Sequence, residues 1–465
     1  IGYVGLSAAF SYAAAALITG EADAGWARAA RPFILLAWIA LTIGITLGSW
    51  WAYYVLGWGG FWFWDPVENA ALMPWLIATA LLHSALATER TGAFRSWTLL
   101  LAILGFSLSL IGTFLVRSGV LSSVHAFASD PTRGVYILAM LAAAIGGALA
   151  LFAWRAPQLQ SGAAFEPVSK ESALLLNNVL LSAAAATVFI GTLYPLLLDA
   201  LTGQKISVGP PYFAITFAPI FVVLILLVPF GPRLGWRNGD WRAALRVLIP
   251  AAGAALVAAI AVFAIVTPRS LVAALAFALG IWTIAAAVID LAKRGDIRGL
   301  PISAYASALA HLGLGVTLLG ITGTTVWRSE ALDLVKPGHA MQIAGYTLHL
   351  EGVQLYQGPN YEAERAIIDV SSGGKPIAVM SPEKRAYPVE GQATAVTAIR
   401  TTGFSDLYLA LGDERDGGWV IRAYVSPLAP FIWFGGAFMA LGGIAGLWGR
   451  LRPRRVTTPQ LAAAE

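Results

Sequence analysis

Hydrophobic and polar positions are grouped along the chain into apolar runs of roughly 20 residues, separated by shorter polar connections. Runs of that length can cross a lipid bilayer as α-helices. We predict eleven spans, near 1–19, 33–56, 66–88, 96–117, 134–154, 172–198, 212–230, 246–267, 270–292, 303–327 and 428–448. The pattern therefore predicts an all-α polytopic membrane protein.

The connection at 328–425 is too long for a loop and has a different pattern. Apolar and polar positions alternate there, as in YTLHLEGVQLY at 346–356, and Gly373-Gly374 marks a turn between such runs. This pattern predicts a β-rich domain, the β domain, inserted before the last helix. We accordingly divide the chain into a helical bundle at 1–327, the β domain at 328–425, a last helix at 426–448 and a tail at 449–465.

Composition and charge agree with a membrane protein. Hydrophobic residues make up 58% of the 465 positions and charged residues 12%, whereas soluble proteins carry about 25% charged residues. Seventeen Lys and Arg residues occupy alternate connections and the tail, and four lie in or directly beside the intervening connections at 57–65, 118–133, 199–211 and 268–269. The positive-inside rule places those four connections and the β domain outside and the tail in the cytoplasm. The net charge of +5 therefore reflects topology and excludes a nucleic-acid partner.

Two further features limit what the chain does by itself. It has no cysteine, which excludes thiol or disulfide chemistry by its own residues. It opens on Ile1 inside an apolar run, with neither Met nor a charged segment before it, so we expect an N-terminally truncated fragment.

The stretch WGGFWFWDPVENA at 58–70 lies at the boundary between a loop and a helix. Asp65 is typical of an N-cap, Pro66 of the first helical position, and Glu68 of the residue that completes a capping box. The simplest role of the two carboxylates is therefore to start the helix at 66–88.

The same stretch carries five aromatic rings and two glycines in what we call the aromatic loop (57–69). One explanation of the rings is the aromatic belt that marks a bilayer surface. The other is a platform for a large planar ligand, because indoles offer wide faces and glycines allow close approach. The residues of this platform would be Trp58, Gly59, Gly60, Trp62, Trp64 and Asp65.

Two of the five histidines, His83 and His311, lie inside predicted spans. His83 is roughly 26 Å from the outer end of its helix, and His311 is roughly 12 Å from the inner end of the other. Because the two spans run in opposite directions, both imidazoles fall in the inner half of the bilayer. They are either unrelated polar residues bonded to neighbouring helices or a pair of axial haem ligands.

His125 lies in the predicted outside connection GVLSSVHAFASDPTRG at 119–134. Arg117 and Arg133 flank this connection, and both could face acidic groups such as haem propionates. The alternative is an ordinary solvated loop histidine. His339 and His349 lie in the β domain, and we expect both to be bystanders.

Several of these motifs together resemble a known family. WGGFWFWDPVENAALMPW resembles the tryptophan-rich WWD signature of haem-handling proteins in cytochrome c maturation. TFLVRSGVLSSVHAFASDPTRG, ESALLLNN, GTLYP, AHLGLGV and GPNY resemble the CcmF branch, the haem lyase subunit, and its relative in nitrite reductase assembly. The resemblance spans essentially the whole chain, with Phe61 standing where the family commonly has another Trp.

The resemblance implies two haem sites. A b-type haem in the membrane would be held by His83 and His311. An incoming haem would rest on the aromatic loop with His125 as one iron ligand. Its second ligand belongs to a motif upstream of GYVG, which here is residues 2–5.

The resemblance also implies an activity and partners. A lyase in the bacterial inner membrane would receive haem from a periplasmic CcmE-type chaperone and join it by thioether bonds to the CXXCH motif of an apocytochrome c. A CcmH-type partner would present the thiols. The b haem would take electrons from quinol and keep the incoming haem reduced. No catalytic acid or base can be assigned.

Two other functions remain open at this point. A haem exporter would suit the many spans, but it predicts broken helices and polar residues along a midplane route. A quinol-oxidising b-type cytochrome would use His83 and His311 but gives no reason for the aromatic loop.

Overall fold

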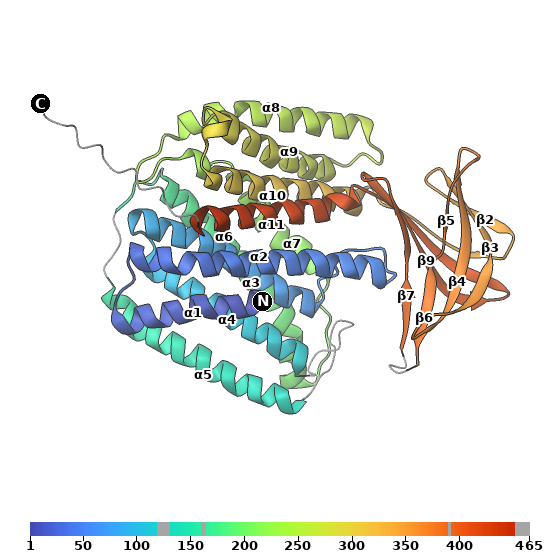
Figure 1. The fold of residues 1–465 in the computed structure, drawn as a ribbon, viewed down its shortest axis with the longest axis horizontal. Coiled ribbons are helices and arrows are strands. Elements are labelled where there is room, and N and C mark those ends of the chain that lie inside the picture. The colour runs from blue at the N-terminus through green and yellow to red at the C-terminus, as the bar shows by residue number, and fades with distance from the viewer. Residues whose placement is uncertain (119–130, 160–163, 389–391, 452–465) are drawn as a thin grey trace, which may run out of the picture.

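The computed structural model describes residues 1–118, 131–159, 164–388 and 392–451, and it consists of a helical bundle with a β domain at one end (Figure 1). Within these residues, eleven helices are long and apolar enough to cross a membrane. They are α1 (Gly2–Thr19), α2 (Ala24–Val55), α3 (Pro66–Thr91), α4 (Arg95–Arg117), α5 (Pro131–Arg155), α6 (Lys170–Thr202), α7 (Pro210–Leu227), α8 (Trp241–Ile265), α9 (Leu271–Ala292), α10 (Ile302–Val326) and α11 (Ala429–Leu451). The predicted fold class is confirmed.

Two helices extend well beyond their predicted apolar runs. α2 has 32 residues and begins at Ala24, nine residues before the predicted span, because Asp23 caps it by accepting from the Trp26 N–H at 2.8 Å. α6 has 33 residues and is capped by Ser169. The Asp23 cap extends α2 past its apolar run, whereas α6 exceeds its predicted run mainly at its C-terminal end, Thr202.

The helices form two packing groups. α3 packs against α2, α4 and α6, whereas α10 packs against α9 and α11. The groups meet where α2 lies beside α11, as Figure 1 shows. Glycines of the motif AHLGLGV give α10 its close neighbours: a Cβ at Gly313 would lie 2.5 Å from the Gly435 carbonyl of α11, and one at Gly315 would lie 2.8 Å from the Gly280 carbonyl of α9. α10 is thus fixed on both sides.

The β domain consists of two antiparallel sheets that share one apolar core. One sheet has the order β1-β10-β9-β8, and the other has the order β2-β3-β4-β6-β7 with β5 paired to β4. Its strands are β1 (Ser329–Val335), β2 (His339–Ile343), β3 (Tyr346–Gln357), β4 (Glu362–Ser372), β5 (Lys375–Met380), β6 (Glu383–Tyr387), β7 (Gln392–Val396), β8 (Ala398–Thr401), β9 (Ser405–Arg415) and β10 (Gly418–Pro427). Leu348 and Ile368 of one sheet and Leu409 and Ile421 of the other belong to the same buried cluster.

Candidate functional site

The aromatic loop ends at the start of α3, where the expected helix cap is present. Asp65 accepts from the Val67 N–H at 2.8 Å and forms a capping box with Glu68, and Pro66 is the first helical residue. Glu68 Oε2 accepts from the backbone N–H of Phe63 at 2.8 Å and of Asp65 at 3.1 Å. The same carboxylate therefore satisfies the helix end and fixes the loop that precedes it.

The second half of the loop is packed against α7. Trp64, which has a φ of 57°, stacks on Phe213 with ring centroids 4.2 Å apart and an interplanar angle of 5°. Trp62 meets Trp64 edge-on at 6.1 Å. Trp64 is therefore held by neighbouring rings, and Trp62 is the next ring outward from this stack.

The first half of the loop lies against the β domain. Gly59 has a φ of 68°, and a Cβ there would lie 2.1 Å from the ring of Tyr424 in β10. A Cβ at Gly60 would lie 2.7 Å from the ring of Phe63. We expected these glycines to admit a planar ligand, but the rings that approach them belong to the protein. A haem contact by Gly59 or Gly60 therefore stays a prediction.

Of the remaining loop residues, Trp58 is 43% exposed and meets Phe63 edge-on at 4.9 Å. It therefore offers an accessible indole face beside the packed part of the loop. His125, the expected ligand of the incoming haem, lies outside the residues that the structure describes.

His83 lies in α3, eight residues before the helix ends at Thr91, and its ring faces α6. The Asn177 Nδ2 and His83 Nδ1 atoms are 3.0 Å apart. An amide can present either its NH₂ group or its oxygen, so Asn177 can also accept from a protonated Nδ1. That tautomer leaves the lone pair of Nε2 available to a metal, as in most histidine–metal sites.

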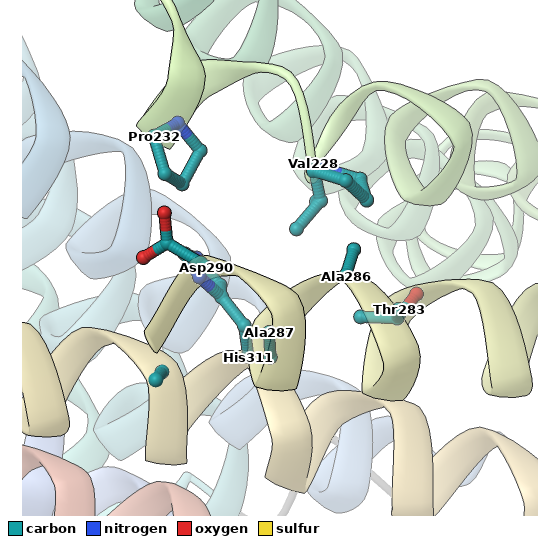
Figure 2. A pocket seen from close by; sticks show the side chains of 9 residues that line it. Val228, Pro232, Thr283, Ala286, Ala287, Asp290 and His311 are labelled. Carbon is teal, nitrogen blue, oxygen red and sulfur yellow. The ribbon is translucent and has the colours of Figure 1, made fainter. Parts of the chain in front are cut away.

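His311 lies in α10, nine residues after the helix begins at Ile302. It lines a small pocket with Asp290, Thr283 and Ala287 of α9 (Figure 2). The Asp290 carboxylate pairs with Arg233 of the short 3-10 helix η2 (Gly231–Arg233) at 3.3 Å and with Arg294 at 2.8 Å. The surroundings of His311 therefore contain a buried carboxylate whose charge is neutralised by two arginines.

The two intramembrane histidines lie at the end of the bundle remote from the β domain, each about 12–14 Å from that helix end at 1.5 Å per residue. Their neighbours Leu82 and Ala310 border one apolar cluster. The structure therefore places His83 and His311, from the two packing groups, beside one apolar cluster and far from the aromatic loop.

The residues present fit a haem held by two histidines. The hydrogen bond of His83 to Asn177 uses Nδ1, so Nε2 is the ring nitrogen that would face an iron. No group of three or more His, Asp or Glu side chains that could hold a bare ion occurs within the residues that the structure describes. A haem iron needs only two axial protein ligands, which is what the pair offers.

Comparison with known proteins defines the class as a polytopic membrane protein of cytochrome c assembly. Residues 1–122 match a family described as "Cytochrome C assembly protein", and residues 326–427 match "CcmF C-terminal beta-sandwich". A "Cytochrome c-type biogenesis protein CycK" of Bradyrhizobium diazoefficiens is 50% identical over 100% of this chain and 72% of its own length. "Cytochrome c-type biogenesis protein CcmF" of Escherichia coli is 44% identical over the same shares.

A solved structure, "Cytochrome c Heme Lyase CcmF", superposes with a TM-score of 0.80 at 30% identity, over 96% of this chain and 70% of that one. The chain belongs to the CcmF family of cytochrome c haem lyases. It is a haem-handling membrane protein that acts as a haem lyase in cytochrome c maturation.

Sequence reasoning missed four residues that the structure places at these sites. Asn177 lies in the quoted motif ESALLLNN, and a buried amide in a membrane span was the available signal. Arg328, Tyr408 and Tyr424 contact the aromatic loop from about 270 to 365 positions away. No local pattern in the sequence indicates such contacts.

Proposed function

We propose that this lyase uses two haem sites at opposite ends of its bundle. His83 and His311 would hold a b haem, whose one-electron chemistry keeps the incoming haem reduced. The aromatic loop, with Trp58, Trp62 and His125, would receive the incoming haem. The observation that carries the proposal is that Leu82 and Ala310, the chain neighbours of His83 and His311, border one apolar cluster although their helices belong to separate packing groups. Asn177 in addition bonds to the His83 ring.

The reaction requires little chemistry from side chains of this chain. Each thioether forms when a substrate thiol adds its sulfur and its hydrogen across a haem vinyl group, with no net electron transfer. Because the chain has no cysteine, both thiols belong to the CXXCH motif of the apocytochrome. The tasks left to the protein are to orient the haem, to exclude water and to keep the thiols beside the vinyl groups.

The proposed partners follow from the same division of tasks. A CcmE-type chaperone delivers haem, a CcmH-type protein presents the apocytochrome, and quinol is the proposed source of electrons. General cytochrome c maturation is favoured over nitrite reductase assembly: in Haemophilus influenzae the relative named CcmF is 45% identical, and the one named NrfE is 38% identical.

The orientation is also a proposal. Basic residues gather at the helix ends remote from the β domain, among them Arg28, Arg90, Arg155, Lys170 and Arg450. By the positive-inside rule this end is cytoplasmic, which places the β domain and the aromatic loop in the periplasm.

The test of the b-haem site is replacement of each histidine. In the purified protein, His83→Ala and His311→Ala should each remove or strongly perturb the b-type absorption, because each removes one axial ligand. His349→Ala, which changes a histidine of β3 bonded to Glu351 at 2.7 Å, is the matched control. An unchanged reduced spectrum in both span variants would exclude this pair as the haem ligands.

A further inference from the structure

Gly59, near the start of the aromatic loop, has both of its backbone polar groups bound by the β domain. Arg328, just before β1, donates from Nη1 to the Gly59 carbonyl at 2.9 Å. The Gly59 N–H donates to the hydroxyl of Tyr408 in β9 at 3.3 Å. Burial raises the pKa of Tyr408 to about 12, so this hydroxyl stays neutral. Two side chains of the β domain therefore hold the backbone of Gly59 on both sides.

A third side chain fixes these two in place. The Arg328 guanidinium lies 4.8 Å above the centroid of the Tyr424 ring, and the Tyr424 hydroxyl donates to Glu330 at 3.1 Å. Tyr408 and Tyr424 meet edge-on at 5.6 Å. The Tyr424 ring also occupies the space that a side chain at Gly59 would need. The position of Gly59 is therefore set by packing as well as by hydrogen bonds.

The residues between the end of α2 and Gly59 also contact the β domain. Thr397 donates from Oγ1 to the Tyr54 carbonyl at 2.6 Å. A Cβ at Gly57 would lie 3.1 Å from the Cβ of Ala395 and 3.9 Å from that of Ala410. Residues 54–59 are thus held by the β domain, whereas 63–65 are held by α3 and α7. Trp58 and Trp62 lie at the boundary between the two attachments.

We propose that the β domain is a clamp that positions the aromatic loop for haem, with Arg328 and Tyr408 as positioning residues. This inference rests on the proposed haem-receiving function of the loop. Rigid strands hold the loop from one side and rigid helices from the other, so its indole faces keep their arrangement before haem arrives. Such preorganisation lowers the entropic cost of capturing a large planar ligand.

The first experiment measures capture of haem-loaded CcmE-type chaperone by the full-length protein. Arg328→Gln and Tyr408→Phe should each weaken capture, Arg328→Gln by roughly tenfold because it removes a charged hydrogen bond. The b-haem spectrum should not change. Arg415→Gln, at an exposed arginine of β9, and Tyr346→Phe in β3 are matched controls and should retain full capture.

Trp58→Ala and Trp62→Ala distinguish a failure of the clamp proposal from a failure of the haem-receiving function proposed for the loop. If these variants lose capture while Arg328→Gln and Tyr408→Phe keep it, the clamp is wrong and the haem-receiving loop stands. If the tryptophan variants also retain capture, the function proposed for the loop fails.

The second experiment locks the clamp. The 3.9 Å between the Cβ positions of Gly57 and Ala410 suits a disulfide, and the chain has no other cysteine. Gly57→Cys with Ala410→Cys, oxidised, should retain capture and restore it in the Arg328→Gln background. Each single variant controls for strain at Gly57, which has a φ of 73°. Failure to form the disulfide, or capture that is lost on oxidation and returns on reduction, would overturn the clamp.

Discussion

At the residue scale, the contact between Asn177 and His83 gives the proposed b-haem site a specific second partner. Asn177→Leu removes the group that orients the imidazole, so we expect haem affinity to fall about 10–100-fold. Asn177→Asp keeps an acceptor for Nδ1–H, so it should retain haem and lower the reduction potential, because the added negative charge favours ferric iron. Haem content and a redox titration of the purified protein check both effects.

The control for Asn177 is Thr187→Val in the same helix, whose hydroxyl donates to the Ala183 carbonyl of the preceding turn at 2.9 Å. It should change neither haem content nor potential. If Asn177→Leu binds haem as the unaltered protein does, the hydrogen bond serves only to join α3 and α6.

The two central tryptophans of the aromatic loop differ in their surroundings, so their substitutions should differ too. Trp64 is partly buried and stacks on Phe213, so Trp64→Ala should cost less than the about 3–5 kcal/mol of a fully buried aromatic ring. Trp62 makes an edge contact with Trp64, and such a ring pair contributes about 0.5–1.5 kcal/mol beyond the area it buries. Trp62→Ala should therefore abolish chaperone capture while the protein stays folded. Trp64→Phe should preserve both the fold and chaperone capture. Thermal unfolding beside the capture assay separates these outcomes.

At the scale of elements, the start of α3 shows what local sequence determines. Asp65, Pro66 and Glu68 predicted this helix start because a cap depends on residues within one turn. The clamp on Gly59 was not predictable, because its partner Arg328 is 269 positions away. The similar depth of His83 and His311 could be predicted from their places in the two spans, whereas the pocket beside His311 depends on how α9 packs on α10.

The cap also makes a quantitative prediction. Asp65→Ala should lower the free energy of unfolding by about 1 kcal/mol, and Asp65→Asn by less, because Asn caps nearly as well. Glu68→Ala should cost more than Asp65→Ala, since it frees two backbone donors, on Phe63 and Asp65. Chemical or thermal denaturation in detergent measures the three losses of stability and so their order. Equal effects of Glu68→Ala and Asp65→Ala would show that the loop does not depend on this carboxylate.

At the scale of the whole molecule, the structure separates two tasks along the bundle. The histidine pair lies toward one end, between packing groups that meet at α2 and α11. The aromatic loop lies at the other end, between α3, α7 and the β domain. Hydropathy and alternation predicted the helices and the domain because both patterns are periodic. Neither pattern contains the long-range contacts that join the domain to the loop.

The orientation of this arrangement in the membrane can be tested with two matched glycines. Gly373, in the turn between β4 and β5, and Gly295, between α9 and α10 at the remote end, both have open space where a side chain would lie. Because the chain has no cysteine, Gly373→Cys and Gly295→Cys each introduce a single thiol. In cells with a permeabilised outer envelope, an impermeant thiol reagent should label Gly373→Cys at once. It should label Gly295→Cys only after the inner membrane is lysed. The reverse pattern would place the β domain in the cytoplasm, and with it the aromatic loop, on the side where no periplasmic chaperone could reach them.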